Sequence, residues 1–180
     1  DDKFYEYVKR YGFGERTELS LGLEERGILE PPKKWDSLTI TRMPMGHAVA
    51  ATPLQIHMAM SAVANSGTLL RPHIFKEIRD CNGNVIRTFP TETRGKVLKP
   101  STAALLAQLL HGVLTDGTAK GYDIAGFDLA GKTGTAQKII DGKYSNSRYV
   151  ASFVGFFPAS RPQVVLSVIV DDAQLPKGVM

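Results

Sequence analysis

The last third of the chain constrains the fold most, because it contains three strand-like runs joined by short turns. Val164–Val170 is aliphatic apart from one serine, which is typical of a strand buried on both faces. Tyr149–Phe157 is almost as apolar, and Ala136–Ile140 precedes it across an Asp-Gly turn. Successive strands with short connections pair antiparallel. We therefore predict an antiparallel meander in which Val164–Val170 is a buried central strand.

Helices are predicted before these strands. Thr52 suits an N-cap, Pro53 suits the first helical position, and Gly67 follows as a stop signal. Residues 101–114 carry leucines on one broad stripe, which predicts a second amphipathic helix. A shorter helix is predicted over residues 2–11. Helices packed on an antiparallel sheet define an α+β fold, and this is the predicted class.

The remaining segments are predicted to be mainly connections. Residues 15–46 lack periodicity and predict a long irregular segment. Asn82-Gly83 lies between two strand-like runs, residues 73–80 and 85–89, and predicts a hairpin. The 180 residues, 43% of them hydrophobic, suffice for one domain or a large part of one. Because the chain begins without an initiator methionine, we expect it to be an excised piece.

Charge and metal-binding residue types argue against several classes of function. The 22 basic and 18 acidic residues give a net charge of +4 and are scattered, so no nucleic-acid partner is predicted. A single cysteine leaves no internal disulfide and no thiolate metal cluster. No metal or cofactor is predicted, because the four histidines lie on separate predicted elements without metal-ligand spacing. They are His47, His57, His73 and His111.

The tetrad Lys132-Thr133-Gly134-Thr135 is the strongest candidate site. It places a cation, two hydroxyl groups and closely spaced backbone N–H groups along one extended segment. A glycine in a strand lets a ligand backbone approach closely. We predict that the tetrad lies on a strand at the edge of the sheet, beside a cleft that binds a carboxylate and stabilises an oxyanion.

A nucleotide-binding loop is the competing interpretation. Residues 126–133 match G-x-x-x-x-G-K-T, and Asp171 follows an apolar strand, as a magnesium ligand would. Such a loop must follow a strand and open a helix, whose N-terminus holds the phosphates. Here the residues after Thr133 reach the Asp141-Gly142 turn too soon for that helix. A nucleotide hydrolase therefore stays a remote alternative.

Several further blocks accompany the tetrad in a fixed order. Together they resemble the transpeptidase domain of class B penicillin-binding proteins, a family in which K-T-G is one of three signatures beside S-x-x-K and S-x-N. The resemblance covers nearly the whole chain and rests on six ordered blocks. They are Tyr11–Gly14, Gly46–Gln55 with Ser61–Gly67, Leu70–Ile74, Gly117-Thr118, Lys132–Thr135 and Ala151–Pro158.

The resemblance implies a peptidoglycan D,D-transpeptidase that β-lactams inhibit. In that family a serine attacks the D-Ala–D-Ala bond, and the acyl-serine passes its acyl group to an amine of a neighbouring strand. Lys132 and Thr135 would support this catalysis, and Lys132, Thr133, Gly134 and Thr135 would bind the substrate. The implied partners are peptidoglycan stem peptides, β-lactam antibiotics and other cell-wall synthesis proteins. The implied location is the extracytoplasmic face of the cytoplasmic membrane, with the parent protein anchored by an N-terminal segment.

The match is incomplete at the nucleophile. No serine of the chain is followed three residues later by lysine, and none is followed two residues later by asparagine. The family carries both motifs upstream of the block that Tyr11–Gly14 resembles. Residues 1–180 are therefore predicted to be the C-terminal portion of a transpeptidase domain without its N-terminal half, and inactive alone. A non-catalytic binding or structural module of the same fold is the alternative, and a β-lactamase would lack the same serine.

Overall fold

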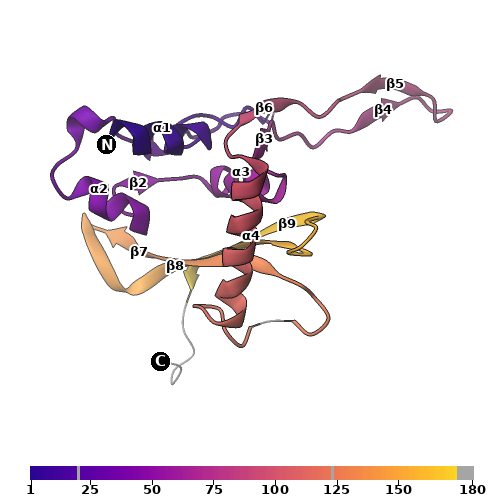
Figure 1. The fold of residues 1–180 in the computed structure, drawn as a ribbon. Helices are drawn as coiled ribbons and strands as arrows, with labels where there is room; N and C mark the ends of the chain where they lie inside the picture. The colour runs from indigo at the N-terminus through magenta and orange to yellow at the C-terminus, as the bar shows by residue number, and fades with distance from the viewer. Residues whose placement is uncertain (20, 123, 174–180) are drawn as a thin grey trace. The chain divides into compact units, whose positions relative to one another are not determined.

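The computed structural model describes residues 1–19, 21–122 and 124–173 (Figure 1). The chain divides into two compact units, Asp1–Thr102 and a second unit that begins at Ala103. The helix α4 (Pro100–Thr115) begins at the end of the first unit and continues into the second.

Short elements and small two-stranded sheets make up the first unit. β1 pairs with β2, β3 with β6 and β4 with β5, each antiparallel. In chain order the elements are α1 (Asp2–Arg10), β1 (Ile28–Leu29), the 3-10 helix η1 (Pro32–Lys34), α2 (Thr39–Arg42), the 3-10 helix η2 (Met43–Met45), β2 (Val49–Ala50), α3 (Pro53–Ala64), β3 (Thr68–Leu70), β4 (Glu77–Arg79), β5 (Val85–Thr88) and β6 (Thr93–Lys96).

The start of α3 is held by a reciprocal capping box. The Thr52 hydroxyl accepts the N–H of Gln55 at 3.2 Å, and the Gln55 side chain accepts the N–H of Thr52 at 2.8 Å. Gln55 is also only 1% exposed, and its amide group donates to backbone carbonyls of the connection before β1. The acceptors are Glu15 at 2.7 Å, Arg26 at 2.9 Å and Gly12 at 3.4 Å. The Gln55 side chain thus both caps α3 and holds in place the irregular connection before β1.

Apolar packing in the first unit centres on α3 and the β3–β6 pair. Leu69 and Val97 are at most 5% exposed and pack with Met58 and Ala62 of α3. Partly buried side chains surround this cluster, and they are Tyr11, Leu54, Leu70 and Leu98.

The predicted helices over residues 2–11 and after Thr52 are confirmed, and residues 15–46 are largely irregular, with only short helices and β1 among the described residues. The β1–β2 and β3–β6 pairs were not predicted, because strands of two to four residues carry almost no periodic signal.

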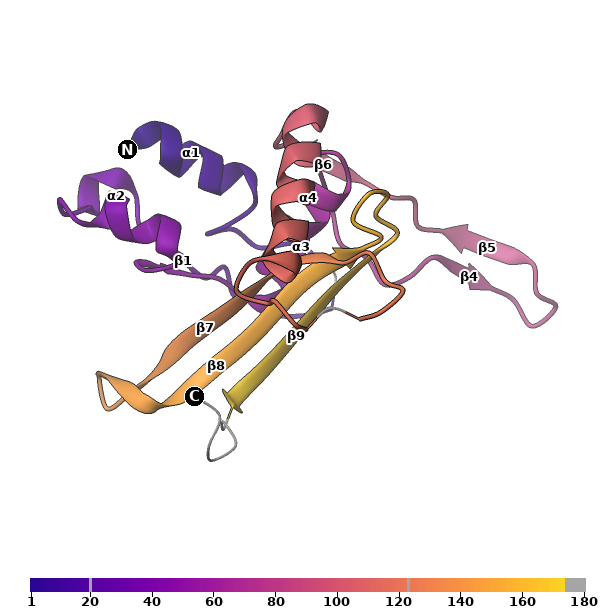
Figure 2. The same ribbon diagram turned by 60° about the horizontal axis from the view of Figure 1, so that its bottom comes forward.

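The predicted hairpin around Asn82-Gly83 is present as β4 and β5. Figures 1 and 2 show it projecting away from the other elements of its unit. The Asp80 carboxylate holds the turn by accepting the N–H groups of Asn82 and Asn84 at 2.9 and 2.8 Å. Gly83 takes a positive φ of 85°, which a glycine adopts without strain.

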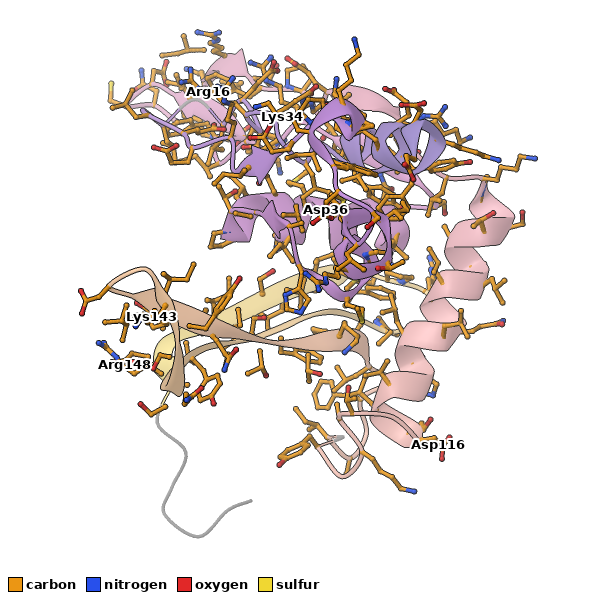
Figure 3. All side chains as sticks on the ribbon, turned by 90° about the vertical axis from the view of Figure 1, so that its left-hand side faces the viewer. Arg16, Lys34, Asp36, Asp116, Lys143 and Arg148 are labelled. Atoms are coloured by element: carbon orange, nitrogen blue, oxygen red, sulfur yellow. The ribbon has the colours of Figure 1, made fainter. Side chains whose placement is uncertain are left out.

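The second unit contains a three-stranded antiparallel sheet in the order β7 (Ala130–Ile140), β8 (Lys143–Phe157) and β9 (Val164–Ala173). The predicted meander and α+β class are therefore confirmed. β8 is the central strand, and the far ends of the three are linked by ion pairs, Lys138 to Asp171 at 2.7 Å and Arg148 to Asp172 at 2.6 Å. Figure 3 shows Arg148 and Lys143 at this end of the sheet.

The prediction that Val164–Val170 is a buried central strand is wrong. It forms β9, which lies at an edge of the described sheet. Alternate side chains are exposed by about half, at Val164, Leu166, Val168 and Val170. An aliphatic run predicts apolar surroundings on both faces, but composition alone cannot say whether the described residues supply them.

Candidate functional site

The tetrad lies within β7, at an edge of the described sheet. β7 pairs only with β8 among the described strands, with Lys132 opposite Val154 and Thr135 opposite Ala151. The predicted edge strand is thus confirmed, and it begins earlier than Ala136. Alternate backbone N–H and C=O groups on the outer side of an edge strand have no strand partner. These groups can therefore pair with an extended ligand.

Lys132 lies among hydroxyl and carbonyl oxygens. Its ammonium group donates to the Thr133 carbonyl at 3.0 Å and is 3.4 Å from the Thr133 hydroxyl and 3.5 Å from the Thr118 hydroxyl. The two threonine hydroxyls are 3.0 Å apart and bonded to each other. No carboxylate pairs with Lys132 in the part of the chain that the structure describes. Its charge therefore remains available to an anionic ligand.

Thr135 and Gly134 complete the tetrad. Thr135 is exposed, and Gly134 is partly buried beside Ser152 on the neighbouring strand. The Ser152 hydroxyl donates to the Gly134 carbonyl at 3.4 Å. Because Gly134 lacks a side chain, the backbone here stays accessible to a ligand that lies along the strand.

In the structure the Thr118 side chain contacts the tetrad, at Thr133 and Lys132. The residues of the tetrad alone could not predict this contact. Thr118 follows the end of α4 and precedes Lys132 by 14 residues, and its place in a matching Gly-Thr block was the only signal available. The Thr52–Gln55 block, by contrast, is structural, because its side chains form the α3 capping box. The structure gives no account of His47, which is exposed.

A hollow of about 550 Å³ borders Thr133 and Thr118 in the second unit. Its walls are almost entirely apolar and include Phe153, Phe157 and Leu166 of the sheet. In register, Thr133 lies opposite Phe153, and Leu166 lies opposite Gly155, so these residues share one face of the sheet. The exposed alternate residues of β9 continue the same face. We call this surface, Phe153, Phe157, Val164, Leu166, Val168 and Val170, the open face.

Asp128 fixes the segment that leads into β7. Its carboxylate accepts both the N–H and the hydroxyl of Ser160 at 3.1 Å, and its carbonyl accepts the N–H of Ala159 at 2.7 Å. His111 of α4 lies 3.5 Å from the same carboxylate and bonds the Leu129 carbonyl through Nδ1 at 2.8 Å. α4, the β8–β9 turn and the start of β7 are thereby joined.

The nucleotide-binding interpretation is wrong. Lys132 and Thr133 lie inside β7, where a phosphate-binding loop would open a helix. Asp171 belongs to β9 and pairs with Lys138 of β7. No triphosphate cradle can form from an extended strand without a helix N-terminus behind it.

Residues 1–19, 21–122 and 124–173 contain no group of three or more potential metal ligands. No helix in the same ranges is both long and apolar enough to cross a bilayer.

Comparison with known proteins decides the family. The profile of the penicillin-binding protein transpeptidase domain matches residues 1–179. The chain belongs to the penicillin-binding protein transpeptidase family. It is 35% identical to stage V sporulation protein D of Bacillus subtilis over 178 residues, which is 98% of the chain and 27% of that relative. It is 28% identical to a probable peptidoglycan D,D-transpeptidase, PenA of Neisseria gonorrhoeae, over 95% of the chain.

Solved structures agree with this family assignment. Penicillin-binding protein 3 of Mycobacterium tuberculosis superposes with a TM-score of 0.85 at 29% identity, covering 96% of this chain and 40% of that one. That protein has also been solved in complex with aztreonam and with ampicillin. The chain thus spans only about a quarter of the length of these two sequence relatives and less than half of this solved structure.

Acid stability of this transpeptidase-family chain should depend on Asp128. The N–H of Ser160, then its hydroxyl and the nearby His111, lower the pKa of the Asp128 carboxyl below its usual 3.8. A lowered pKa stabilises the fold above the unfolded pKa of about 3.9, and this stabilisation is lost as pH falls through the folded value. In urea titrations, Asp128→Asn should therefore flatten the loss of stability below about pH 4.

Ser160→Ala is the matched comparison for that prediction. It removes the hydroxyl donor but keeps the N–H donor, so its acid profile should lie between those of the wild type and Asp128→Asn. Identical profiles for all three proteins would show that Asp128 does not contribute.

Gly131 should not tolerate a side chain. A Cβ at this position would lie 2.9 Å from the Val154 carbonyl oxygen and 3.0 Å from Gly155 Cα, and would meet the Phe153 ring. The two backbone neighbours belong to the central strand and cannot move aside. We expect Gly131→Ala to lower the free energy of unfolding by about 2–3 kcal/mol in urea titrations monitored by circular dichroism.

Gly134, three residues along the same strand, is the control. Its Cβ would meet only the Ser152 hydroxyl, at 2.5 Å, and this side chain can rotate. Gly134→Ala should therefore cost at most about 1 kcal/mol. Equal losses for the two variants would contradict the packing seen around Gly131.

Proposed function

We propose that this chain is the C-terminal portion of a peptidoglycan D,D-transpeptidase domain, with β7 lining the acyl-transfer groove. The observation that carries the proposal is the setting of Lys132. This cation lies on an edge strand, 3.4 and 3.5 Å from two threonine hydroxyls and without a carboxylate partner in the described residues. That arrangement suits an extended peptide that ends in a carboxylate.

Three residues of the tetrad, Lys132, Thr133 and Thr135, then have defined tasks. Lys132 holds the substrate carboxylate and raises the positive potential of the groove, and Thr133 and Thr135 offer hydroxyl groups to the same anion. The Thr135 N–H donates to the oxyanion that forms when a serine attacks the substrate carbonyl. Thr118, bonded to the Thr133 hydroxyl, keeps that hydroxyl oriented.

The serine itself must come from outside residues 1–180. Its Oγ forms a bond to the carbonyl carbon of the D-Ala–D-Ala peptide bond, the terminal D-Ala leaves with a proton, and an acyl-serine remains. An amine of a neighbouring stem peptide then displaces the serine and completes the cross-link. β-Lactams would form the same acyl-serine bond and be released slowly.

The open face supports the proposal that more of the domain packs here. Val164, Leu166, Val168 and Val170 are 44–54% exposed, and they continue the apolar wall of the hollow beside Thr133. A contiguous apolar surface of this kind marks an interface. We propose that the N-terminal half of the domain, with the nucleophile, covers it.

The proposed setting follows from the same family. The parent protein would act at the extracytoplasmic face of the cytoplasmic membrane, anchored by an N-terminal segment. Its partners would be peptidoglycan stem peptides, β-lactams and other cell-wall synthesis proteins.

A fluorescent penicillin tests the proposal. The chain alone should form no stoichiometric adduct, whereas the same chain expressed with the adjoining N-terminal polypeptide should form one adduct per molecule. Mass spectrometry should locate that adduct on a serine of an S-x-x-K motif outside residues 1–180. An adduct on the isolated chain would refute the assignment. No adduct on the longer, folded protein would favour a non-catalytic module of the same fold.

A further inference from the structure

The β4–β5 hairpin carries an unpaired surface that the proposed reaction does not use. Among the described strands it pairs with no third strand, and every residue of β5 is exposed. Apolar side chains on it reach water, with Ile86 67% and Ile78 45% exposed. Figures 1 and 2 show the hairpin extending away from α1, α3 and the β3–β6 pair of its own unit. Exposed apolar groups on a projecting element are typical of an interaction surface.

One face of the hairpin is both apolar and cationic. Ile78 lies opposite Arg87 in the strand register, and the N–H of Phe89 donates to the carbonyl of Lys76 at 2.9 Å. Side chains two residues apart on a strand share a face, so these four lie together. We call this surface, Lys76, Ile78, Arg87 and Phe89, the cationic face. The Arg87 guanidinium lies 4.7 Å from the centre of the Phe89 ring, which holds it over the apolar surface.

The carboxylates of the hairpin have partners within the hairpin. The two cations of the cationic face have no carboxylate partner among the described residues. Glu77 pairs with Arg79 at 2.6 Å, and the Asp80 carboxylate accepts hydrogen bonds of the turn. Neither Lys76 nor Arg87 has a carboxylate partner in the described ranges. The charge left for a partner is therefore positive, and the complementary surface is acidic.

A hollow at the base of the hairpin supplies room for an anchoring side chain. It measures about 200 Å³, and its lining includes Ile74, Phe75, Arg87 and Phe89. Glu18 and Glu92 also line it, and both of their carboxylates pair with Arg71. An apolar side chain buried in such a hollow, with charge pairs around it, is the usual arrangement of an interface hot spot. The hydrogen bonds that the Asp80 carboxylate accepts order the turn of the hairpin before any partner binds. This order lowers the entropic cost of docking.

We propose that the cationic face of the β4–β5 hairpin docks an acidic segment of another protein, with one apolar side chain seated in the basal hollow. A membrane surface fits less well, since recognition of anionic lipids takes clusters of about four to eight basic residues and this face has two. The proposal is independent of the acyl-transfer groove.

Designed peptides test this surface on the whole chain. The probe is a blocked, fluorescently labelled peptide in which glutamates alternate with valines around one phenylalanine, and its twin carries lysine for glutamate. Anisotropy should show binding of the acidic peptide only, weakening with salt. The double variant Lys76→Glu/Arg87→Glu should bind the acidic peptide at least about tenfold more weakly and should gain binding of the lysine peptide.

The control variant is Lys3→Glu/Lys33→Glu, which makes the same change in net charge at two other exposed positions. It should bind the acidic peptide as the wild type does, and circular dichroism should show that both variants fold. Absence of binding up to about 1 mM, or equal binding of both peptides, would overturn the proposal. Binding to vesicles of about one-third phosphatidylglycerol that is lost in the hairpin variant, without peptide binding, would replace the protein partner by a membrane.

Discussion

Replacing Lys132 by alanine in the proposed longer transpeptidase is expected to slow acylation by a β-lactam by about two to three orders of magnitude. Lys132 is the cation of the β7 edge, and no carboxylate in the described residues neutralises it. Under the proposed function, its loss would remove both the attraction for the substrate carboxylate and the positive potential beside the developing oxyanion. The second-order rate constant for acylation, followed with a fluorescent penicillin, is the measurement.

Lys138→Ala is the matched control on the same strand. Lys138 pairs with Asp171 at the far end of the sheet, so its removal should leave acylation unchanged within about twofold. Lys132→Arg should recover only part of the rate, because a planar guanidinium cannot take the place of a compact ammonium group. If Lys132→Ala and Lys138→Ala slow acylation equally, the groove does not run along this part of β7.

Changing Gln55 to glutamate is expected to lower the free energy of unfolding of the chain by about 3–5 kcal/mol. The side chain is 1% exposed, and its amide donates to the carbonyls of Gly12, Glu15 and Arg26. A carboxylate cannot donate, so it would place a buried negative charge against carbonyl oxygens. The deficit should shrink at low pH, where the protonated acid regains one donor. Urea titration with circular dichroism measures it.

Two further variants separate charge from packing at this position. Gln55→Met keeps much of the volume but leaves the carbonyls unsatisfied, so it should cost less than Gln55→Glu, about 2–3 kcal/mol. Gln108→Glu makes the same chemical change on an exposed part of α4 and should cost less than about 0.5 kcal/mol. A loss below 1 kcal/mol for Gln55→Glu would show that Gln55 does not hold the segment before β1 in place.

Several features were predictable because their signal lies within a few consecutive residues. Thr52 and Pro53 predicted the start of α3, and Asn82-Gly83 predicted the β4–β5 turn. The tetrad was recognisable from its residue types, and its place on an extended edge strand followed from the short distance to the next turn. Each prediction needed only local backbone preferences and short-range hydrogen bonds.

Other features depend on residues far apart in the chain and could not be predicted. Gln55 reaches a carbonyl 43 residues away, and Thr118 meets Lys132 across an intervening loop. The placement of Val164–Val170 as a buried central strand was wrong, since an aliphatic run does not reveal which neighbours cover it. The sequence by itself determined the family, the main helices and strands, and the residues that carry the candidate chemistry. Only the tertiary structure decided the edge position of β9, the hydroxyl groups around Lys132 and the buried role of Gln55, because such contacts arise from packing between distant segments.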